Sequence, residues 1–562
     1  MRTLCSALLF LAACGDSGPG TSTPRAARSA GSHPDEIFGE LSTAERKDFE
    51  PGDIVNGGRA VLPSATDIGT FNPYLSTSAY DYEIHTRLYP FPLRENADFH
   101  KGPPTFRPGV VDKWSVDGKR ITMHIRDDAV WSDGVPITAE DARFSLQAAK
   151  DEDVAWTNTA YVDHITHCEV VDSKTYVLHF ALAYPYMLKD AKDWRILPKH
   201  IYGKIPFKDW KGYQGWDNAA RTVSGPYKLE SYRYNEEFVL VPNDRYWDKS
   251  LPRLERIHIR VLKDKQTIFE SLLTGELDMQ DSVDGRNARK VLEHPDFYLY
   301  NHSGLIYDYL GWNCDFWLFK DAAVRRALTL AINVKRMIPS LLHGYGKPLN
   351  GPFVSTSWAY DPTVPIRPYD PEQAEKILSD LGWAPGDDGV LRKDGKPFQF
   401  TITTNSSNER RMQAVQYIQA DLKKIGVKVR VQPSDFNTMG ENLRKGREDA
   451  WVGGWWLSSK VDLKNIFHID SIGGWNFGRW RHKEASRLIE EARVELDLEK
   501  ARKMWHRIHR IMHEEQPYTW LYELRAIHAV RKKFNNVEIN ANQTYYNLSE
   551  WFIPKELQGM TR

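Results

Sequence analysis

The stretch from Pro397 to Gln432 constrains the fold of this chain more than any other. It begins with the apolar run PFQFTITT, passes through a segment with apolar residues at helical spacing, and ends with the alternating run VKVRVQ. The inward positions of the middle segment are Met412, Val415, Ile418 and Leu422. A strand, a helix and a second strand in this order form a parallel pair joined by a right-handed crossover. The stretch therefore predicts an α/β fold.

Residues 121–146 predict a strand, a turn and a helix. Ile121, Met123 and Ile125 alternate with polar residues, which is the period of a strand with one buried face. Asp133-Gly134 has the chemistry of a turn. Thr138, followed three residues later by Asp141, forms a capping box, so a helix is expected to begin near Ala139.

Further elements repeat this alternation without an internal repeat. Residues 257–261 predict a strand and residues 267–274 a helix. Asp370-Pro371 supplies an N-cap and a proline at the first helical position, and Gly382 ends the helix. The apolar stripe of that helix consists of Ala374, Ile377, Leu378 and Leu381.

Length and charge limit the possible architectures and partners of this protein. A chain of 562 residues is too long for one core, so two or three packed lobes are expected. Lys plus Arg and Asp plus Glu both number 75, so no bulk charge indicates a nucleic acid partner. The 19 tryptophans suit either large cores or a stacking surface for a ligand.

The N-terminus predicts export and a lipid anchor. Arg2 precedes the apolar run from Leu4 to Ala13, which has the length of a signal peptide and is too short to span a bilayer. Leu11-Ala12-Ala13-Cys14 resembles the lipobox of bacterial lipoproteins, in which Cys14 becomes lipidated. Residues 15–34 are small and polar, as in a tether. We expect an exported protein, periplasmic or at the cell surface, anchored to a membrane.

Cysteine, histidine and catalytic patterns give little support to an enzyme or a metal site. Cys168 and Cys314 remain after processing, and two isolated thiols are expected rather than a disulfide. His506, His509 and His513 share a helix face that we expect to be solvated, and His164-x-x-His167 alternates along a strand. The chain lacks a Gly-x-Ser-x-Gly elbow, a Walker loop and a His-Glu-x-x-His helix. We expect no catalytic residue, no metal and no cofactor.

Seven segments in order resemble one family. The resemblance runs from about residue 56 to the C-terminus. They are ATDIGTFNPY (65–74), the stretch 106–146, SGPYKLESYRYNEEFVLVPNDRYWD (224–248), LLTGELDM (272–279), FKDAAVRRALTLAIN (319–333), YDPEQAEKILSDLGW (369–383) and QPYTWLYE (516–523). The chain resembles the extracellular solute-binding proteins of the oligopeptide and dipeptide type, which deliver ligands to ABC importers.

The resemblance implies a bilobed periplasmic-binding-protein-like fold of type II with an extra subdomain. Trp131, Asp133 and Gly134 would then be architectural. Hinges are expected near 315–320 and 518–524, and the protein is expected to be a monomer that meets permease subunits. The implied parts are a signal peptide (1–13), a lipid-anchored tether (14–52), lobe I (53–92, 221–318 and 522–562), the extra subdomain (93–220) and lobe II (319–521).

The same resemblance locates the ligand site and shows one departure. In peptide-binding relatives an aspartate that follows a Gly-Trp pair neutralises the α-ammonium of the peptide. Here Gly454-Trp455 matches the pair, but the aspartate position holds Ser458, or Ser459 in a shifted alignment, with Asp462 nearby. A hydroxyl cannot replace a carboxylate opposite a buried ammonium. The expected ligand contacts are Trp455, Trp456, Ser458, Asn476, Tyr309, Thr77 and Ala79.

Three ligand classes stay open. Trp455, Trp456, Trp475 and Trp480 crowd the same region, and aromatic faces stack on sugars as readily as on peptide side chains. We predict a peptide or modified peptide, with an oligosaccharide or a metal chelate as the alternative. A cell-surface hydrolase of peptides or glycans is the alternative of another class, and it would need a nucleophile or paired carboxylates.

Overall fold

The computed structural model describes residues 40–41, 54–541 and 543–558. The chain divides into Met1–His33 and Pro34–Arg562, and every described residue belongs to the second unit. The predicted signal peptide, Cys14 and most of the predicted tether lie outside the described residues. Within the described ranges, no helix combines the length and the apolarity that crossing a bilayer requires.

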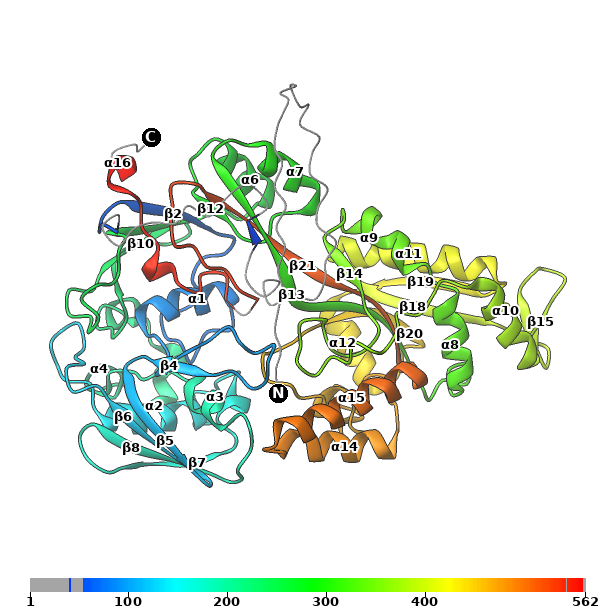
Figure 1. Cartoon of the computed structure of the whole chain (residues 1–562), viewed down its shortest axis with the longest axis horizontal. Helices are drawn as coiled ribbons and strands as arrows, with labels where there is room; N and C mark the ends of the chain where they lie inside the picture. Colours follow the sequence, from blue (N-terminus) through cyan, green and yellow to red (C-terminus); the bar gives the residue numbers. More distant parts are fainter. Residues whose placement is uncertain (1–39, 42–53, 542, 559–562) are drawn as a thin grey trace, which may run out of the picture. The chain divides into compact units, whose positions relative to one another are not determined.

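One large sheet runs through the protein (Figure 1). Its two long strands, β13 (Phe297–Trp312) and β21 (Tyr518–Arg531), pair antiparallel along most of their length. The order is β12-β21-β13-β20-β18-β19, with β1 added to β13 and β14 added to β21. The other strands are β12 (Met279–Gln280), β20 (Ala450–Trp456), β18 (Gln399–Asn405), β19 (Lys428–Ser434), β1 (Glu40–Leu41) and β14 (Gly346–Pro348).

The predicted strand-helix-strand unit is confirmed. β18 and β19 pair in parallel, and α11 (Glu409–Lys424) connects them. Asn408 caps α11, since its side chain accepts a hydrogen bond from the amide of Arg411. Three of the four predicted inward residues of α11 are buried, and Met412 is half-buried because it lies in the first turn.

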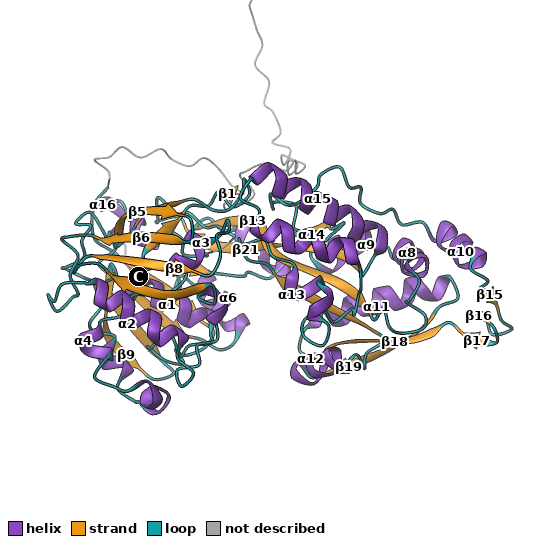
Figure 2. Cartoon of the chain, turned by 90° about the horizontal axis from the view of Figure 1, so that it is seen from below, coloured by secondary structure: helices purple, strands orange, loops and turns teal. Residues whose placement is uncertain are grey.

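Strands β18, β19 and β20, together with the helices that pack on them, form the part of the protein that we call lobe II. Helices cover both faces of the sheet in this lobe. Residues of β13 alternate between two cores: Tyr309 belongs to one, and Leu310 and Trp312 belong to the other. The core with Leu310 includes α8 (Ala322–Leu330), α9 (Val334–Leu341), α10 (Pro371–Asp380) and α11. The core with Tyr309 includes α12 (Phe436–Lys445), α13 (Lys464–Phe467), α14 (Lys483–Val494) and α15 (Leu498–Glu515), of which α14 and α15 lie side by side (Figure 2).

The rest of the chain, which we call lobe I, contains two four-stranded sheets. One has the order β2-β11-β10-β9, with β2 and β11 parallel, and helix α1 contacts it. The other, β5-β6-β8-β7, is antiparallel and lies in the inserted subdomain, by which we mean the elements from β3 to α5. The bounds are β2 (Arg59–Ser64), α1 (Ala79–Leu88), β5 (Val111–Asp117), β6 (Arg120–Ile125), α2 (Ala139–Lys150), β7 (Ile165–Val170), β8 (Thr175–Phe180), β9 (Tyr227–Arg233), β10 (Glu237–Pro242) and β11 (Arg256–Val261).

Short elements complete the fold. α6 (Lys265–Leu273) and α7 (Gly285–Glu293) belong to lobe I and pack on the end of β13. The remaining strands and helices are β3 (Leu93–Glu95), β4 (Phe106–Pro108), α3 (Met187–Lys192), α4 (Lys199–Tyr202), α5 (Trp216–Ala219), β15 (Ala384–Pro385), β16 (Leu391–Lys393), β17 (Lys396–Pro397) and α16 (Lys555–Gln558).

The predicted strand-turn-helix of residues 121–146 is confirmed. The hydroxyl of Thr138 accepts from the amide of Asp141, and the Asp141 carboxylate accepts from the amide of Thr138, which is a complete capping box. Trp131 is fully buried and points its indole N–H at the Asp141 carboxylate. Gly134 has a φ of 95°, which glycine adopts at little cost. These residues are architectural.

The expectation of a solvated histidine face on α15 is wrong. His509 is fully buried, its Nδ1 accepts from the amide of Asp361 at 3.0 Å, and its Nε2 lies 3.1 Å from the side-chain oxygen of Asn350. His513 contacts the carbonyl of the same asparagine. These histidines hold the irregular segment with Asn350 and Asp361 against the helix. The sequence did not show this, because a hydrogen bond to a residue 148 positions away leaves no local pattern. Cys168 and Cys314 are both free thiols, as expected.

Candidate ligand-binding site

An aromatic stack forms where β13 pairs with β20. The ring of Trp455 lies parallel to that of Tyr309, with 6.1 Å between centroids, and also parallel to Phe477 at 5.8 Å. Gly453, opposite Tyr309 in the pairing, leaves room for the tyrosine ring, because a Cβ there would lie 3.1 Å from its hydroxyl. Trp475 meets the edge of Trp455 at 5.8 Å. Two of the expected ligand contacts, Tyr309 and Trp455, are therefore brought together, and Trp475, expected in the same region, lies against them.

Several polar groups in and around this stack lack a partner among the described residues, including the indole N–H of Trp455 itself. Two of them are the hydroxyl of Tyr307 and the indole N–H of Trp520, whose rings lie 5.9 Å apart. Both residues are buried. A buried donor without a partner costs about 1–3 kcal/mol, so these groups favour a ligand or a water molecule that supplies the missing hydrogen bonds.

Two arginines converge on one carboxylate on the opposite face of the β13–β20 pair from the stack. Asp308 is fully buried in β13, and its oxygens lie 2.8 Å from Nε of Arg410 and 3.0 Å from Nε of Arg411. Both arginines belong to the first turn of α11. A Cβ on Gly454 would collide with Arg411 and Asp308 and lie 2.8 Å from the carbonyl of Tyr307, so the glycine permits this approach. Two guanidinium groups on one carboxylate leave one positive charge without a counter-charge inside the group.

The segment after β20 does not present a carboxylate to this site. Ser458 is exposed, and its hydroxyl accepts from the amide of Lys460 at 3.1 Å. Ser459 is buried and donates to Glu95 of the inserted subdomain at 2.9 Å. Asp462 is engaged by Arg493, whose Nε lies 2.8 Å away. The neighbourhood of Ser458 is thus neutral or already paired.

The other expected contact residues lie in varied places. Asn476 is buried, and its amide donates to the carbonyls of His468 and Trp480 and accepts from the amide of Trp480, so its hydrogen-bonding capacity serves the local loop. Trp456 is 71% exposed and follows Trp455 on the opposite face of β20, whereas Trp480 is buried.

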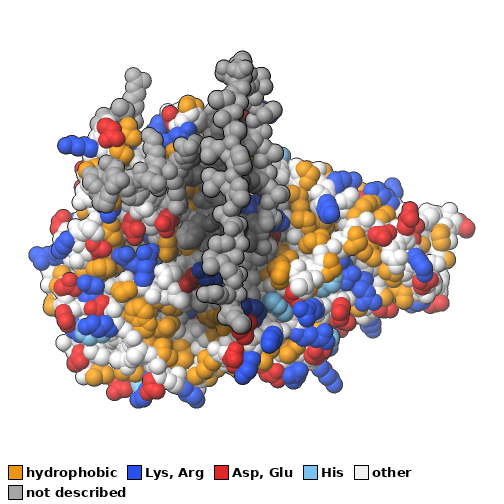
Figure 3. Space-filling view, in the orientation of Figure 1, with side chains coloured by type: hydrophobic (Ala, Val, Ile, Leu, Met, Phe, Trp, Pro, Cys, Tyr) orange, Lys and Arg blue, Asp and Glu red, His pale blue; other side chains and the backbone are white. Residues whose placement is uncertain are grey.

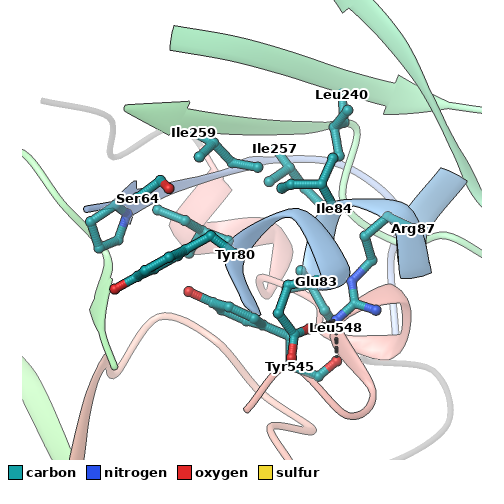
Figure 4. A pocket seen from close by; sticks show the side chains of 12 residues that line it. Ser64, Tyr80, Glu83, Ile84, Arg87, Leu240, Ile257, Ile259, Tyr545 and Leu548 are labelled. Atoms are coloured by element: carbon teal, nitrogen blue, oxygen red, sulfur yellow. Dashed lines mark hydrogen bonds and ion pairs between the residues drawn. The ribbon is translucent and has the colours of Figure 1, made fainter. Parts of the chain in front are cut away.

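Thr77 and Ala79 belong to lobe I. Thr77 is exposed, and Ala79 is the first residue of α1, whose N-cap is Ser78. The next residue, Tyr80, lines a small pocket between α1 and the β2-β11-β10-β9 sheet. In Figure 4, Ile84, Ile257 and other aliphatic side chains form the apolar part of this pocket, and the rings of Tyr80 and Tyr545 lie beside one another.

The arginine pair was missed by reasoning from the sequence. Its signals were present: Arg410 and Arg411 lie at the start of the predicted helix, and Asp308 is a charged residue within the apolar run GLIYDYLGW. A charge in a buried strand requires a partner. Only the pairing of β13 with β20 brings this partner close. The remaining charges of the visible face are mixed in sign, as the even composition predicts (Figure 3).

Comparisons with known proteins agree with this architecture. Residues 70–476 match the family described as "Bacterial extracellular solute-binding proteins, family 5 Middle". The chain is 28% identical to the oligopeptide-binding protein AppA of Bacillus subtilis over 564 residues, which covers 97% of both chains. It is 23% identical to heme-binding protein A of Haemophilus influenzae over 552 residues, which covers 92% of each. The structure of AppA from Bacillus subtilis in complex with a nonapeptide is similar, with a TM-score of 0.72, 26% identity and coverage of 89% of this chain and 100% of that one.

Proposed function

Since the chain belongs to the bacterial extracellular solute-binding proteins of family 5, we propose that it is the receptor of an ABC importer and captures a peptide or a peptide-like ligand. The bilobed fold of this family gives two surfaces between which a ligand is held. The relatives named for oligopeptides, AppA above all, support a peptide as the ligand. Delivery would require contact with the permease subunits of the importer, and a monomer is sufficient for this role.

The arginine pair on Asp308, which packs against Gly454 on the opposite face of β20 from Trp455, is the observation that carries the ligand class. One net positive charge at this end of β20 suits a carboxylate, because arginine binds carboxylates through two parallel hydrogen bonds. The stack suits an aromatic or aliphatic side chain. The hydroxyl of Tyr307 and the indole of Trp520 suit peptide carbonyls. This combination matches the carboxyl-terminal part of a peptide.

The amino end of the ligand is proposed to be uncharged. Ser458 offers a hydroxyl, and the nearby Asp462 already forms an ion pair with Arg493. An ammonium group that loses its water here would gain no counter-ion, and burial of an unpaired charge is costly. An N-acylated or otherwise modified peptide avoids this cost.

Capture is proposed to proceed by closure of the lobes about β13 and β21. The register of this pair shifts between Ser303 and Tyr307, so the residues between them interrupt the ladder. Such a bulge is a local change in pairing at which two parts of a sheet can pivot. A ligand that contacts both lobes favours the closed form. Turning a mostly open protein into a mostly closed one requires a preference of roughly 5.5 kcal/mol.

A thermal-shift series with one peptide sequence in three forms tests the proposal. The forms are the free peptide, the N-acetylated peptide and the peptide with an amidated carboxyl end. A ligand at 100 times its Kd adds about 2.7 kcal/mol to the stability of the protein. We expect the N-acetylated form to stabilise at least as well as the free form, and the amidated form to stabilise less. Stabilisation by free-amino peptides alone would show that the interpretation of Ser458 is wrong.

An oligosaccharide is the second candidate, because two tryptophans near the site are open to solvent. Trp456 is 71% exposed and Trp475 48% exposed, and exposed indole faces stack on sugar rings. A metal chelate is a further candidate within the same fold. Stabilisation by oligosaccharides or chelates, and by none of the peptides, would favour these ligands.

We infer that the chain acts as a receptor and not as a hydrolase. The contacts proposed for the ligand are aromatic faces, arginines and neutral donors, none of which is a nucleophile with an adjacent base. Incubation with peptide and glycan pools should therefore release no products.

Export and lipid attachment at Cys14 are also proposed, and mass spectrometry of the mature N-terminus would test them.

A further inference from the structure

A short segment of lobe II reaches across to the inserted subdomain. We call residues 457–462 the latch segment. The amide of Val461 donates to the hydroxyl of Tyr186 at 3.0 Å, and the hydroxyl of Ser459 donates to Glu95 at 2.9 Å. Nζ of Lys460 lies 3.1 Å and 3.0 Å from the two oxygens of Asp190. Three consecutive residues of lobe II thus contact three different groups of the inserted subdomain.

The contact between Lys460 and Asp190 is shielded from water. The Asp190 carboxylate is fully buried and the lysine side chain is 19% exposed. The hydroxyl of Tyr184 donates to the same carboxylate, and the lysine nitrogen lies 5.3 Å from the centre of the Tyr184 ring. Removal of either partner would leave the other charge buried without a counter-ion, which is costly.

The carboxylates near the latch segment differ in which lobe supplies their cation. Lys189 and Lys192 of the inserted subdomain bridge Glu95 and Asp193 at 2.8–3.2 Å. Asp190 instead forms its ion pair with Lys460 of lobe II. This ion pair is made only when the two lobes are in contact.

We propose that Lys460 is a built-in cation that fastens lobe II to the inserted subdomain and raises the population of the closed form in the absence of ligand. The inference rests on the proposed hinge closure, but it requires no particular ligand. The apparent Kd equals the intrinsic Kd of the closed form divided by the fraction of protein that is closed without ligand. A larger closed fraction therefore lowers the apparent Kd. Lys460 would therefore act on affinity through the lobe equilibrium and without touching the ligand.

The titration of Asp190 reflects its burial more than its ion pair with Lys460. Burial raises the pKa of Asp190 to about 6, against the opposing effect of Lys460 and of the Tyr184 hydroxyl. Asp193 is the other charged group that acts on it. The carboxylate is charged at neutral pH and is available to the lysine.

Small-angle X-ray scattering of the ligand-free protein tests the proposal. Lys460→Met removes the cation, and Lys464→Met is the matched control, since Lys464 pairs with Glu490 at 2.7 Å within lobe II. We expect the wild type and K464M to scatter like the structure with the latch contacts made. We expect K460M to have a larger radius of gyration, with the ratio of closed to open protein reduced about tenfold, which is ~1.4 kcal/mol.

Two further variants distinguish loss of the ion pair from misfolding of the variant protein. The double variant Lys460→Met with Asp190→Asn leaves no unpaired charge, and it should be as open as K460M. The exchanged pair, Lys460→Asp with Asp190→Lys, should restore the compact form. An open wild type without ligand, or a double neutral variant as compact as the wild type, would overturn the inference. Neither result depends on the identity of the ligand, so the peptide proposal would be unaffected.

Discussion

Replacement of Asp308 by asparagine tests whether a buried charge holds the arginine pair. The Asp308 side chain is 0% exposed, whereas Arg410 is 30% and Arg411 14% exposed. The exchange keeps the shape of the side chain and removes the charge that both guanidinium groups contact. Removal of one partner from a buried ion pair costs about 3–5 kcal/mol, and partial exposure of the arginines lets water screen part of this, so we expect a loss of about 2–3 kcal/mol.

Urea unfolding followed by tryptophan fluorescence measures this loss. Asp315→Asn is the matched control, because Asp315 also contacts two arginines, Arg479 and Arg481, but is 43% exposed. Exposed pairs contribute about 0–1 kcal/mol, so the control should unfold close to the wild type. Equal losses in the two variants, or an Asp308→Asn protein as stable as the wild type, would refute the reasoning that burial decides the energy of this group.

Three further outcomes are expected. Burial lowers the pKa of His302 to about 4 and that of His528 well below its usual value, so the unfolded chain binds more protons. The free energy of unfolding should therefore fall as the pH drops from about 6.5 to about 4, and His528→Gln should reduce this slope in urea titrations at several pH values. Gly454→Ala should lower the midpoint of unfolding because its Cβ collides with Arg411, whereas Gly212→Ala, where nothing lies within 4 Å, should leave it unchanged. Trp475→Ala should weaken ligand binding in calorimetry with little effect on stability, since Trp475 is 48% exposed; an unchanged Kd would remove this residue from the site.

The two buried histidines show how the pH effect arises. The Nδ1 of His302 donates to the carbonyl of Ser303 at 3.0 Å, so its Nε2 accepts from Nε2 of His528 at 3.1 Å. This arrangement requires His302 to be neutral, because its Nε2 must accept, while Nδ1 of His528 is buried without a partner among the described residues. A second proton on either ring would put a positive charge inside the buried β13–β21 pair, and such a charge without a counter-ion is unfavourable.

The sequence alone determined the elements whose signals are local. The capping box of α2 depends on residues three apart, and the cap and stripe of α10 depend on residues within eleven positions. Side chains at such short separations meet whenever the backbone is helical. The α/β class followed in the same way from the run 397–432, and the family resemblance extended it to the bilobed fold. The sequence also indicated that Trp455 and Trp475 share one region, and their rings are in contact, whereas their contact with a ligand stays a prediction.

Tertiary structure decided every contact between distant residues. Asp308 meets Arg410 across 102 positions, and Lys460 meets Asp190 across 270. His509, expected in solvent, is buried by a segment some 150 residues earlier in the chain. Such partners are chosen by the pairing of strands and the packing of lobes, and many carboxylates in the chain could have served as well. A side chain's type states what it can bind, but only the folded chain determines which of its possible partners lies within reach.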